Sequence, residues 1–171
     1  MITSAGVNTT PKVSNVGLSN AHYTGCLRPS PDCSKLALAF GNANNFEVVD
    51  FDNSTGVISN PITSPANYPY TYGINFSPDG KLLYVGTNKV GKIYQFNLEA
   101  GSATDIINSE KVIGTASIGF GLGLGTFQLG PDGKMYIAKS GMKSLGVIKN
   151  PNVLGNGCSY IDNGFTLGGG A

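Results

Sequence analysis

Apolar and polar positions follow a pattern along this chain that occurs three times. The stretch "FSPDGKLLYVGT" (residues 76–87) joins two apolar runs through a turn centred on Pro-Asp, and related text stands at residues 29–40 ("PSPDCSKLALAF") and 129–140 ("LGPDGKMYIAKS"). Short apolar runs bounded by turn residues are typical of β-strands. The three copies therefore predict three β-hairpins of one kind.

The turn residues support this interpretation. Proline presets φ at the first turn position, aspartate accepts hydrogen bonds from the backbone that follows it, and glycine supplies the positive φ of a tight hairpin. We assign a structural role to the turn residues of the three copies: Pro31 and Asp32; Pro78, Asp79 and Gly80; Pro131, Asp132 and Gly133. Cys33 stands where the other copies have glycine, so we expect the first turn to be looser or of another type.

Each copy continues in the same order after its turn. A second strand, a polar glycine-containing break, a third strand, another turn and a less regular fourth strand follow. In the strand before the turn, Leu27, Ile74 and Phe127 occupy equivalent positions. No segment carries apolar residues with the period of a helix, so we expect very low helix content.

Four short strands in a unit of about 45–50 residues describe the blade of a β-propeller. We predict an all-β, β-propeller-type fold with about three four-stranded blades, in one domain over residues 1–171. The predicted blades span about residues 22–64, 69–117 and 119–167. A β-sandwich is the alternative, but it does not need the same turn at the same place in each unit.

Three blades are too few for a closed ring, because propellers have about four to eight. An arc leaves two blade faces bare and apolar, and an apolar face of that size marks an interface. We expect further blades of the same polypeptide, or copies of this chain, to cover these faces. Of the two, we favour a chain that is part of a longer protein.

Charge excludes some partners. Eleven basic and ten acidic residues leave a net charge of +1, and they form no basic cluster of the kind that nucleic-acid-binding proteins show. No run of about 18 apolar residues predicts a membrane span. The first twelve residues lack the basic start and apolar run of a signal peptide.

Three cysteines, Cys26, Cys33 and Cys158, are an odd number. We expect Cys26 in a strand and Cys33 in the turn that follows, on the order of 15 Å apart along a hairpin and too far to bridge. An oxidised partner would be Cys158 or lie outside the chain. Three free thiols are the simpler interpretation.

The sequence offers little for catalysis. His22 is the single histidine, and no serine stands in a Gly-x-Ser-x-Gly elbow, so a nucleophilic triad is not predicted. One histidine and three scattered cysteines do not make a zinc site. The glycine-rich residues 119–125 lack the context of a phosphate-binding loop, and we interpret them as a connector and strand entry.

The segment "DFDNSTG" (residues 50–56) is the one weak metal candidate. Asp50, Asp52 and Asn53 place oxygen side chains before a glycine, as calcium loops do. The twelfth position is Pro61 rather than glutamate, and the repeat places a hairpin turn here. We therefore predict no cofactor, with calcium as the single weak alternative.

Three closely spaced tyrosines are the weak candidates for binding. Tyr68, Tyr70 and Tyr72 would share one face of a strand, because side chains alternate along a strand. They could form a platform for sugar or peptide. The same spacing at the entry of the innermost strand of the second blade also suits core or channel-lining residues, and this is the interpretation that we favour.

The stretches "YGINFSPDGKLLYVGT…GKIYQFNL", "FQLGPDGKMYIAKSG…LGVIKNPN" and "CSYIDNGFTLGGG" resemble the surface propeller repeats of Bacteroidetes-type bacteria. Those repeats are similar to lactonase-like, YVTN-type and WD-type propellers, and they occur in secreted proteins associated with gliding motility or type IX secretion. The resemblance implies an extracellular or cell-surface location. Lactonases of this shape hold a metal at the central channel, for which the non-turn carboxylates here are Glu47, Asp50 and Asp162.

We therefore expect a non-catalytic extracellular propeller module that acts as a binding scaffold or spacer in a larger surface or secreted protein. Its partner would be an unidentified protein or glycan at the cell surface. A lactonase-like propeller enzyme is the first alternative. A self-assembling surface subunit is the second.

Overall fold

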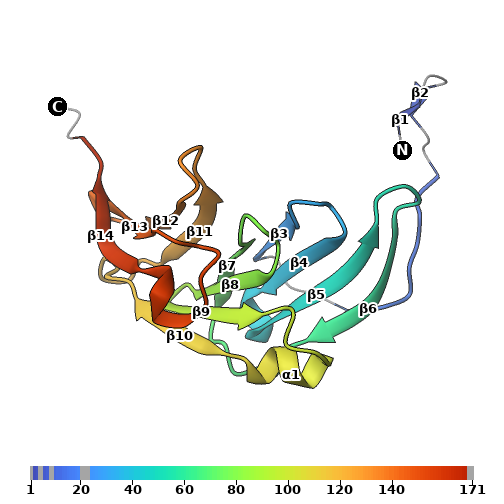
Figure 1. Cartoon of the computed structure of the whole chain (residues 1–171), viewed down its shortest axis with the longest axis horizontal. Coiled ribbons are helices and arrows are strands. Elements are labelled where there is room, and N and C mark those ends of the chain that lie inside the picture. Colours follow the sequence, from blue (N-terminus) through green and yellow to red (C-terminus); the bar gives the residue numbers. More distant parts are fainter. Residues whose placement is uncertain (1, 4–5, 8–9, 20–23, 169–171) are drawn as a thin grey trace.

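Three four-stranded antiparallel sheets follow one another along the chain in the computed structural model (Figure 1), which describes residues 2–3, 6–7, 10–19 and 24–168. In each sheet the strands pair in sequence order, so each sheet is a simple meander. The first sheet contains β3 (Gly25–Pro29), β4 (Lys35–Phe40), β5 (Asn45–Asp52) and β6 (Val57–Thr63). The second contains β7 (Thr71–Phe76), β8 (Leu82–Thr87), β9 (Lys92–Asn97) and β10 (Lys111–Thr115). The third contains β11 (Leu124–Leu129), β12 (Met135–Lys139), β13 (Ser144–Ile148) and β14 (Tyr160–Thr166).

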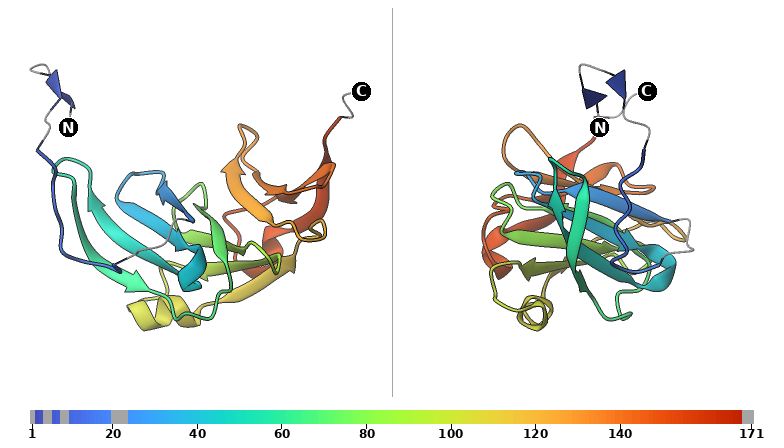
Figure 2. Two further views of the ribbon diagram at one scale, coloured as in Figure 1. Left: turned by 180° about the vertical axis from the view of Figure 1, so that it is seen from behind. Right: turned by 90° about the vertical axis from the view of Figure 1, so that its right-hand side faces the viewer.

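The sheets are arranged as an arc of propeller blades (Figures 1 and 2). The first strand of the middle sheet, β7, contacts the first strands of both neighbours, β3 and β11. The fourth strands lie on the outside of the arc, and the ring is not closed. The predicted all-β, propeller-type fold with three four-stranded blades is confirmed. A separate short pair, β1 (Ile2–Thr3) and β2 (Gly6–Val7), lies apart from the blades.

Two apolar cores hold the blades together, one at each junction. Between the first and second blades, Ile74 and Phe76 of β7 are fully buried with Phe46 and Phe96. Between the second and third blades, Tyr84 of β8 is buried in a cluster that also contains Phe127, Met135 and Ile137. Burial of aromatic and branched side chains on both faces makes the middle blade the centre of the packing.

The outer face of the first blade has no blade against it. Leu27 pairs with Leu38, as Ile74 pairs with Val85 and Phe127 with Ile137 in the other blades. Leu27 is 52% exposed, whereas its two equivalents are fully buried. One of the two bare blade faces predicted for an arc therefore lies on the β3 side of the first blade.

Part of this face is covered by residues 10–19, which run along it (Figure 2, right). The amide of Leu18 donates to both oxygens of the Glu47 carboxylate, at 3.2 and 3.3 Å. The amide of Ile58 in β6 donates to the Ser14 hydroxyl at 3.1 Å. Residues 10–19 therefore bury Glu47 on β5, while Leu27 on β3 stays exposed.

The repeated turns are alike in all three copies. The amide of the third turn residue donates to the carbonyl of the residue before proline in each one, from Cys33, Gly80 and Gly133. All three residues have positive φ, 57°, 74° and 75°. The expectation of a looser or different first turn is therefore wrong, because Cys33 adopts the left-handed conformation that glycine provides elsewhere.

A short helix, α1 (Ala103–Asn108), precedes β10 and was not predicted. Its N-terminus is closed by a capping box, in which Ser102 and Asp105 exchange hydrogen bonds between side chain and backbone. Two short 3₁₀ helices, η1 (Gly41–Ala43) and η2 (Gly155–Cys158), add little to the helix content. Helix content is low, as expected, and α1 is too short to show a helical apolar period.

Cys26 lies in β3 and Cys33 in the turn that follows, as predicted, and both are free. Cys158 is buried and also free, and burial raises the pKa of its thiol. Within the described part of the chain, no helix has the length and apolar character that a membrane crossing requires.

Candidate functional site

The loops that leave the arc at one end form the candidate site. In a meander the second-to-third connection lies at the end opposite the first turn, and so does the link from a fourth strand to the next blade. Residues 41–44, 64–70, 88–91, 116–123 and 140–143 make these connections, and we call them the loop rim. Backbone hydrogen bonds join them, from Tyr68 to Asn44, Asn88 to Tyr70 and Leu124 to Asn88.

A pocket of about 270 Å³ opens in the loop rim where the first and second blades meet. Both blades and their linker supply its lining: Thr24, Gly41, Asn42, Tyr70, Thr71, Tyr72, Asn88 and Lys89. Hydroxyl, amide and ammonium groups surround two aromatic rings. Such a mixture of flat apolar surface and a few polar groups is typical of ligand sites.

Tyr70 has an unusual backbone conformation in this pocket. Its φ is +54°, in the left-handed region that bulky side chains rarely adopt. The Tyr70 amide donates to the Asn44 side-chain oxygen at 2.9 Å, and its carbonyl accepts from the Asn88 amide at 2.8 Å. These bonds hold a strained residue whose side chain remains 40% exposed. Strain of this kind is often found at functional sites.

Lys89 places its ammonium over the Tyr70 ring, 3.9 Å from the centroid. A cation over an aromatic face is attracted by the negative potential of the ring. The ion pairs found among the described residues involve Lys35, Lys81, Lys134 and Lys139, and none involves Lys89. Its positive charge therefore faces the pocket without a described carboxylate beside it.

A second pocket of about 530 Å³ adjoins the first, since Lys89 lines both. The rest of its lining comes from the glycine-rich linker: Ile118, Gly119, Phe120, Gly121 and Leu122. Phe120 is fully exposed and Leu122 is 44% exposed. The interpretation of residues 119–125 as connector and strand entry is confirmed, because β11 begins at Leu124.

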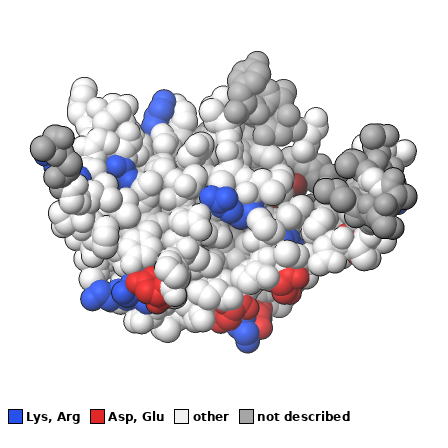
Figure 3. Space-filling model, turned by 90° about the horizontal axis from the view of Figure 1, so that it is seen from above, with Lys and Arg blue, Asp and Glu red and all other residues white. Residues whose placement is uncertain are grey.

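Charged side chains are few on one face of the molecule and in the linings of the two rim pockets. In the view from above (Figure 3), most of the surface is uncharged, and the acidic residues gather mainly along the lower margin. The described linings of the two rim pockets contain one charged side chain, that of Lys89.

The three tyrosines predicted to share a strand face are separated by the structure. Tyr68 and Tyr70 precede β7, and only Tyr72 lies in it. Tyr68 is buried among Phe46, Tyr94 and Phe96, and its hydroxyl donates to Glu110. Burial, assisted by that hydrogen bond, raises the pKa of Tyr68. A single platform of three rings is therefore wrong: one ring is core, and Tyr70 and Tyr72 line the rim pocket.

The weak calcium candidates lie at the turn between β5 and β6, where the hairpin was predicted. The Asp52 carboxylate accepts hydrogen bonds from the amides and hydroxyls of Ser54 and Thr55, which lower its pKa to about 2. Asp50 instead accepts from Lys35 and Asn60. The two carboxylates are engaged with different partners, so the structure brings no calcium cage together from Asp50, Asp52 and Asn53.

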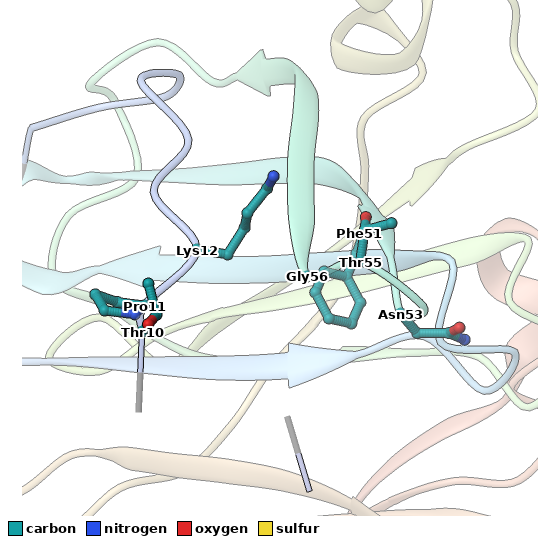
Figure 4. Close-up of a pocket in the computed structure, with 7 residues that line it drawn as sticks. All are labelled: Thr10, Pro11, Lys12, Phe51, Asn53, Thr55 and Gly56. Carbon is teal, nitrogen blue, oxygen red and sulfur yellow. The ribbon is translucent and has the colours of Figure 1, made fainter. Parts of the chain in front are cut away.

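Asn53 lines a separate pocket of about 430 Å³ (Figure 4). Pro11 and Lys12 of the N-terminal segment form one side of it, and Phe51, Thr55 and Gly56 of the hairpin form the other. It lies where residues 10–19 cross the first blade, at the β5–β6 turn and so at the end of the blade opposite the loop rim.

The three non-turn carboxylates that a lactonase would use have separate partners. Glu47 binds Leu18 and Thr63, and Asp50 binds Lys35. Asp162 on β14 accepts from the Ser117 amide and from Lys139; burial opposes the change, but these bonds lower the pKa of Asp162. No three His, Cys, Asp or Glu residues cluster as metal ligands within residues 2–3, 6–7, 10–19 and 24–168. His22 lies outside the described residues.

Asn42, Lys89 and Phe120 were not singled out from the sequence. Each stands in a short polar or glycine-rich break between predicted strands. Their membership of one rim depends on blade stacking, which no local pattern reports. Two sequence features could have pointed to the rim: an aromatic residue among glycines, Phe120, and a lysine within a predicted break between strands, Lys89.

Comparison with solved structures places this geometry in a known fold. The chain is similar to a functionally unknown protein from Desulfotomaculum acetoxidans DSM 771, with a TM-score of 0.59 and 17% identity over 98% of this chain and 49% of that one. It is similar to a candidate 6-phosphogluconolactonase from Bacteroides fragilis NCTC 9343, with a TM-score of 0.53 and 16% identity over 83% of this chain and 40% of that one. A match to Kuenenia stuttgartiensis hydrazine synthase has a TM-score of 0.52 and 18% identity, over 81% of this chain and 36% of that one.

The fold is an arc of β-propeller blades, as in these solved proteins. The chain spans about half or less of the length of these solved proteins. No protein-family profile matches the sequence. No curated protein matches it either.

Proposed function

We propose that this chain is a non-catalytic binding module, which presents the loop rim of a propeller arc to a partner outside the cell. The single observation that carries the proposal is the strained and exposed Tyr70 with Lys89 over its ring, in a pocket built by two blades. A rigid β scaffold that displays loops is a common way to build a binding surface.

The chemistry of the pocket favours binding over hydrolysis. General acid–base catalysis needs a titratable group such as His, Glu or Asp within reach of the substrate. The described residues that line the two rim pockets include no Asp, Glu, His or Cys. Lys89, Tyr70 and Tyr72 are the titratable groups in these linings, and without a described carboxylate or imidazole beside them we assign them to orienting a ligand.

The wider setting follows from the sequence resemblance. We propose an extracellular or cell-surface location, as part of a larger secreted protein of the Bacteroidetes type in which the arc acts as a scaffold or spacer. The shared fold with proteins about twice as long supports a larger propeller.

A binding screen with a parallel activity assay tests the proposal. The purified chain would be applied to arrays of surface glycans and proteins, beside a Tyr70→Ala/Lys89→Ala double variant and a Lys111→Ala control on exposed β10. We expect binding that the double variant loses and the control keeps. Hydrolysis of a panel of sugar lactones, with and without added calcium, would be measured in the same samples. Lactone turnover, or binding that the double variant retains, would contradict the proposed role.

A further inference from the structure

The two rim pockets adjoin at Lys89, so together they form one extended candidate binding surface. The first contains Tyr70 and Tyr72, the second contains Phe120 and Leu122, and Lys89 belongs to both. Exposed aromatic rings therefore lie at each end and a single ammonium lies in the middle. From this arrangement we propose that the loop rim binds an anionic polysaccharide, an inference that rests on the proposed binding function.

The aromatic residues favour sugar rings. Tyrosine combines a flat apolar face with a polar hydroxyl, so it can pack against a sugar ring and bond its hydroxyls. Tyr72 and Asn42 line the same pocket as Tyr70 and add hydroxyl and amide groups. Together the pockets reach the size of small-molecule sites, about 300–1,000 Å³.

Lys89 favours a negative charge on the ligand. The described pocket linings contain no carboxylate, and Lys89 has no described ion-pair partner. Its contact with the Tyr70 ring fixes the ammonium at the edge shared by both pockets. An anionic group on one sugar would meet that charge while the ring packs on an aromatic side chain.

A peptide ligand fits less well. Extended peptides add along an exposed strand edge, where their main chain continues the sheet. The rim pockets are instead built by loops that connect strands, and the strand β7 beside them is surrounded by β3, β8 and β11. The side chains, rather than a backbone edge, are what this surface presents.

Matched polysaccharides test the charge. Binding of the chain to polygalacturonate and to its fully methyl-esterified form would be measured by titration calorimetry, because the two share a backbone and differ in charge. Dextran sulfate and dextran form a second pair, which separates a sulfate from a carboxylate preference. We expect one charged polymer to bind at least tenfold more tightly than its neutral partner, and the preference to weaken as salt screens the charge.

Variants separate the two pocket components. Lys89→Ala should weaken binding of the charged polymer about tenfold or more, Lys89→Arg should keep it, and the exposed control Lys111→Ala should stay within about twofold. Tyr70→Gly should lose binding while its melting temperature is unchanged or higher, since glycine accepts the positive φ without strain. A merely structural Tyr70 would instead lower the melting temperature.

The outcomes distinguish this inference from the proposed function. Equal, Tyr70-dependent binding of charged and neutral polymers would overturn the anionic assignment and leave the binding role standing. No binding to either pair of polymers would overturn the assignment to polysaccharides. If no glycan or protein on the wider arrays binds in a way that depends on Tyr70 and Lys89, the proposed function itself is overturned.

Discussion

At the scale of single residues, Cys33 and Tyr70 adopt the same uncommon backbone conformation for different reasons. Cys33 closes a hairpin in which Gly80 and Gly133 occupy the equivalent positions with nearly the same hydrogen bond. Tyr70 lies in a linker where no repeat demands positive φ, and its ring is exposed in a pocket. The positive φ of Cys33 thus allows the hairpin turn to close, whereas the positive φ of Tyr70 accompanies an exposed ring in the rim pocket.

Replacing Cys33 by glycine should therefore stabilise the chain. A left-handed residue other than glycine costs about 1–2 kcal/mol, and the greater freedom of unfolded glycine offsets about 0.5–1 kcal/mol of that. We expect Cys33→Gly to raise the free energy of unfolding by about 0.5–1 kcal/mol, measured by urea denaturation. Gly133→Ala is the matched reverse change, because a Cβ at Gly133 would meet nothing within 4 Å. If Cys33→Gly lowers stability, the turn depends on the thiol rather than on φ.

At the scale of elements, the turns are held by carboxylates that accept local hydrogen bonds. Asp32 accepts from Ser30 and Ser34, Asp52 from Ser54 and Thr55, and Asp132 from Lys134 and Tyr136. In each case these bonds lower the pKa of the aspartate to about 2. Hydrogen bonds to the charged form stabilise it, so the turns are firmest when the carboxylates are ionised.

Acid should therefore weaken the hairpins. A pKa below the unfolded value of about 3.9 contributes stability that is fully present above pH 4 and is lost as pH falls through about 2. We expect the urea midpoint to fall between pH 5 and pH 2.5. Asp52→Asn should lower the midpoint more at pH 6 than at pH 2.5, because at the lower pH the carboxylate of the unfolded chain is protonated and keeping it ionised in the folded chain costs part of the advantage. Equal effects at both pH values would show that the ionised form of Asp52 contributes nothing.

At the scale of the whole molecule, one register position has two environments. Leu27, Ile74 and Phe127 occupy equivalent places in β3, β7 and β11, but only the last two lie between blades. None of the three blades in the described part of the chain covers Leu27. That this face is covered, by further blades or by copies of the chain, stays a prediction. Light scattering of the purified chain would detect association between copies.

Alanine at these positions should reveal the junctions directly. Ile74→Ala and Phe127→Ala should each lower the free energy of unfolding by about 2–5 kcal/mol, because they leave cavities in the two cores. Leu27→Ala should cost under about 1 kcal/mol in a monomer, since the side chain is 52% exposed. Chemical denaturation at low protein concentration measures all three. A large cost at Leu27 would indicate that the face is covered in solution.

The strands, their order within each blade and the turns between them could be predicted from local sequence patterns. These features depend on neighbours a few residues apart: proline and aspartate at turn positions, and alternating side chains in the runs between them. The equivalence of Leu27, Ile74 and Phe127 could also be read from the three aligned copies, but not that only the last two are buried. The helix α1 was missed because six residues under a local cap carry no period.

Which surfaces meet became clear from the packing of the blades against one another. Tyr68 lies in the core and Tyr70 in a pocket, although the two tyrosines are only two residues apart in the sequence. Lys89 lies where the two rim pockets adjoin. The packing also separates Glu47, Asp50 and Asp162 among different partners. Burial and convergence depend on how whole blades stack, and stacking joins residues that are about a blade apart in the chain.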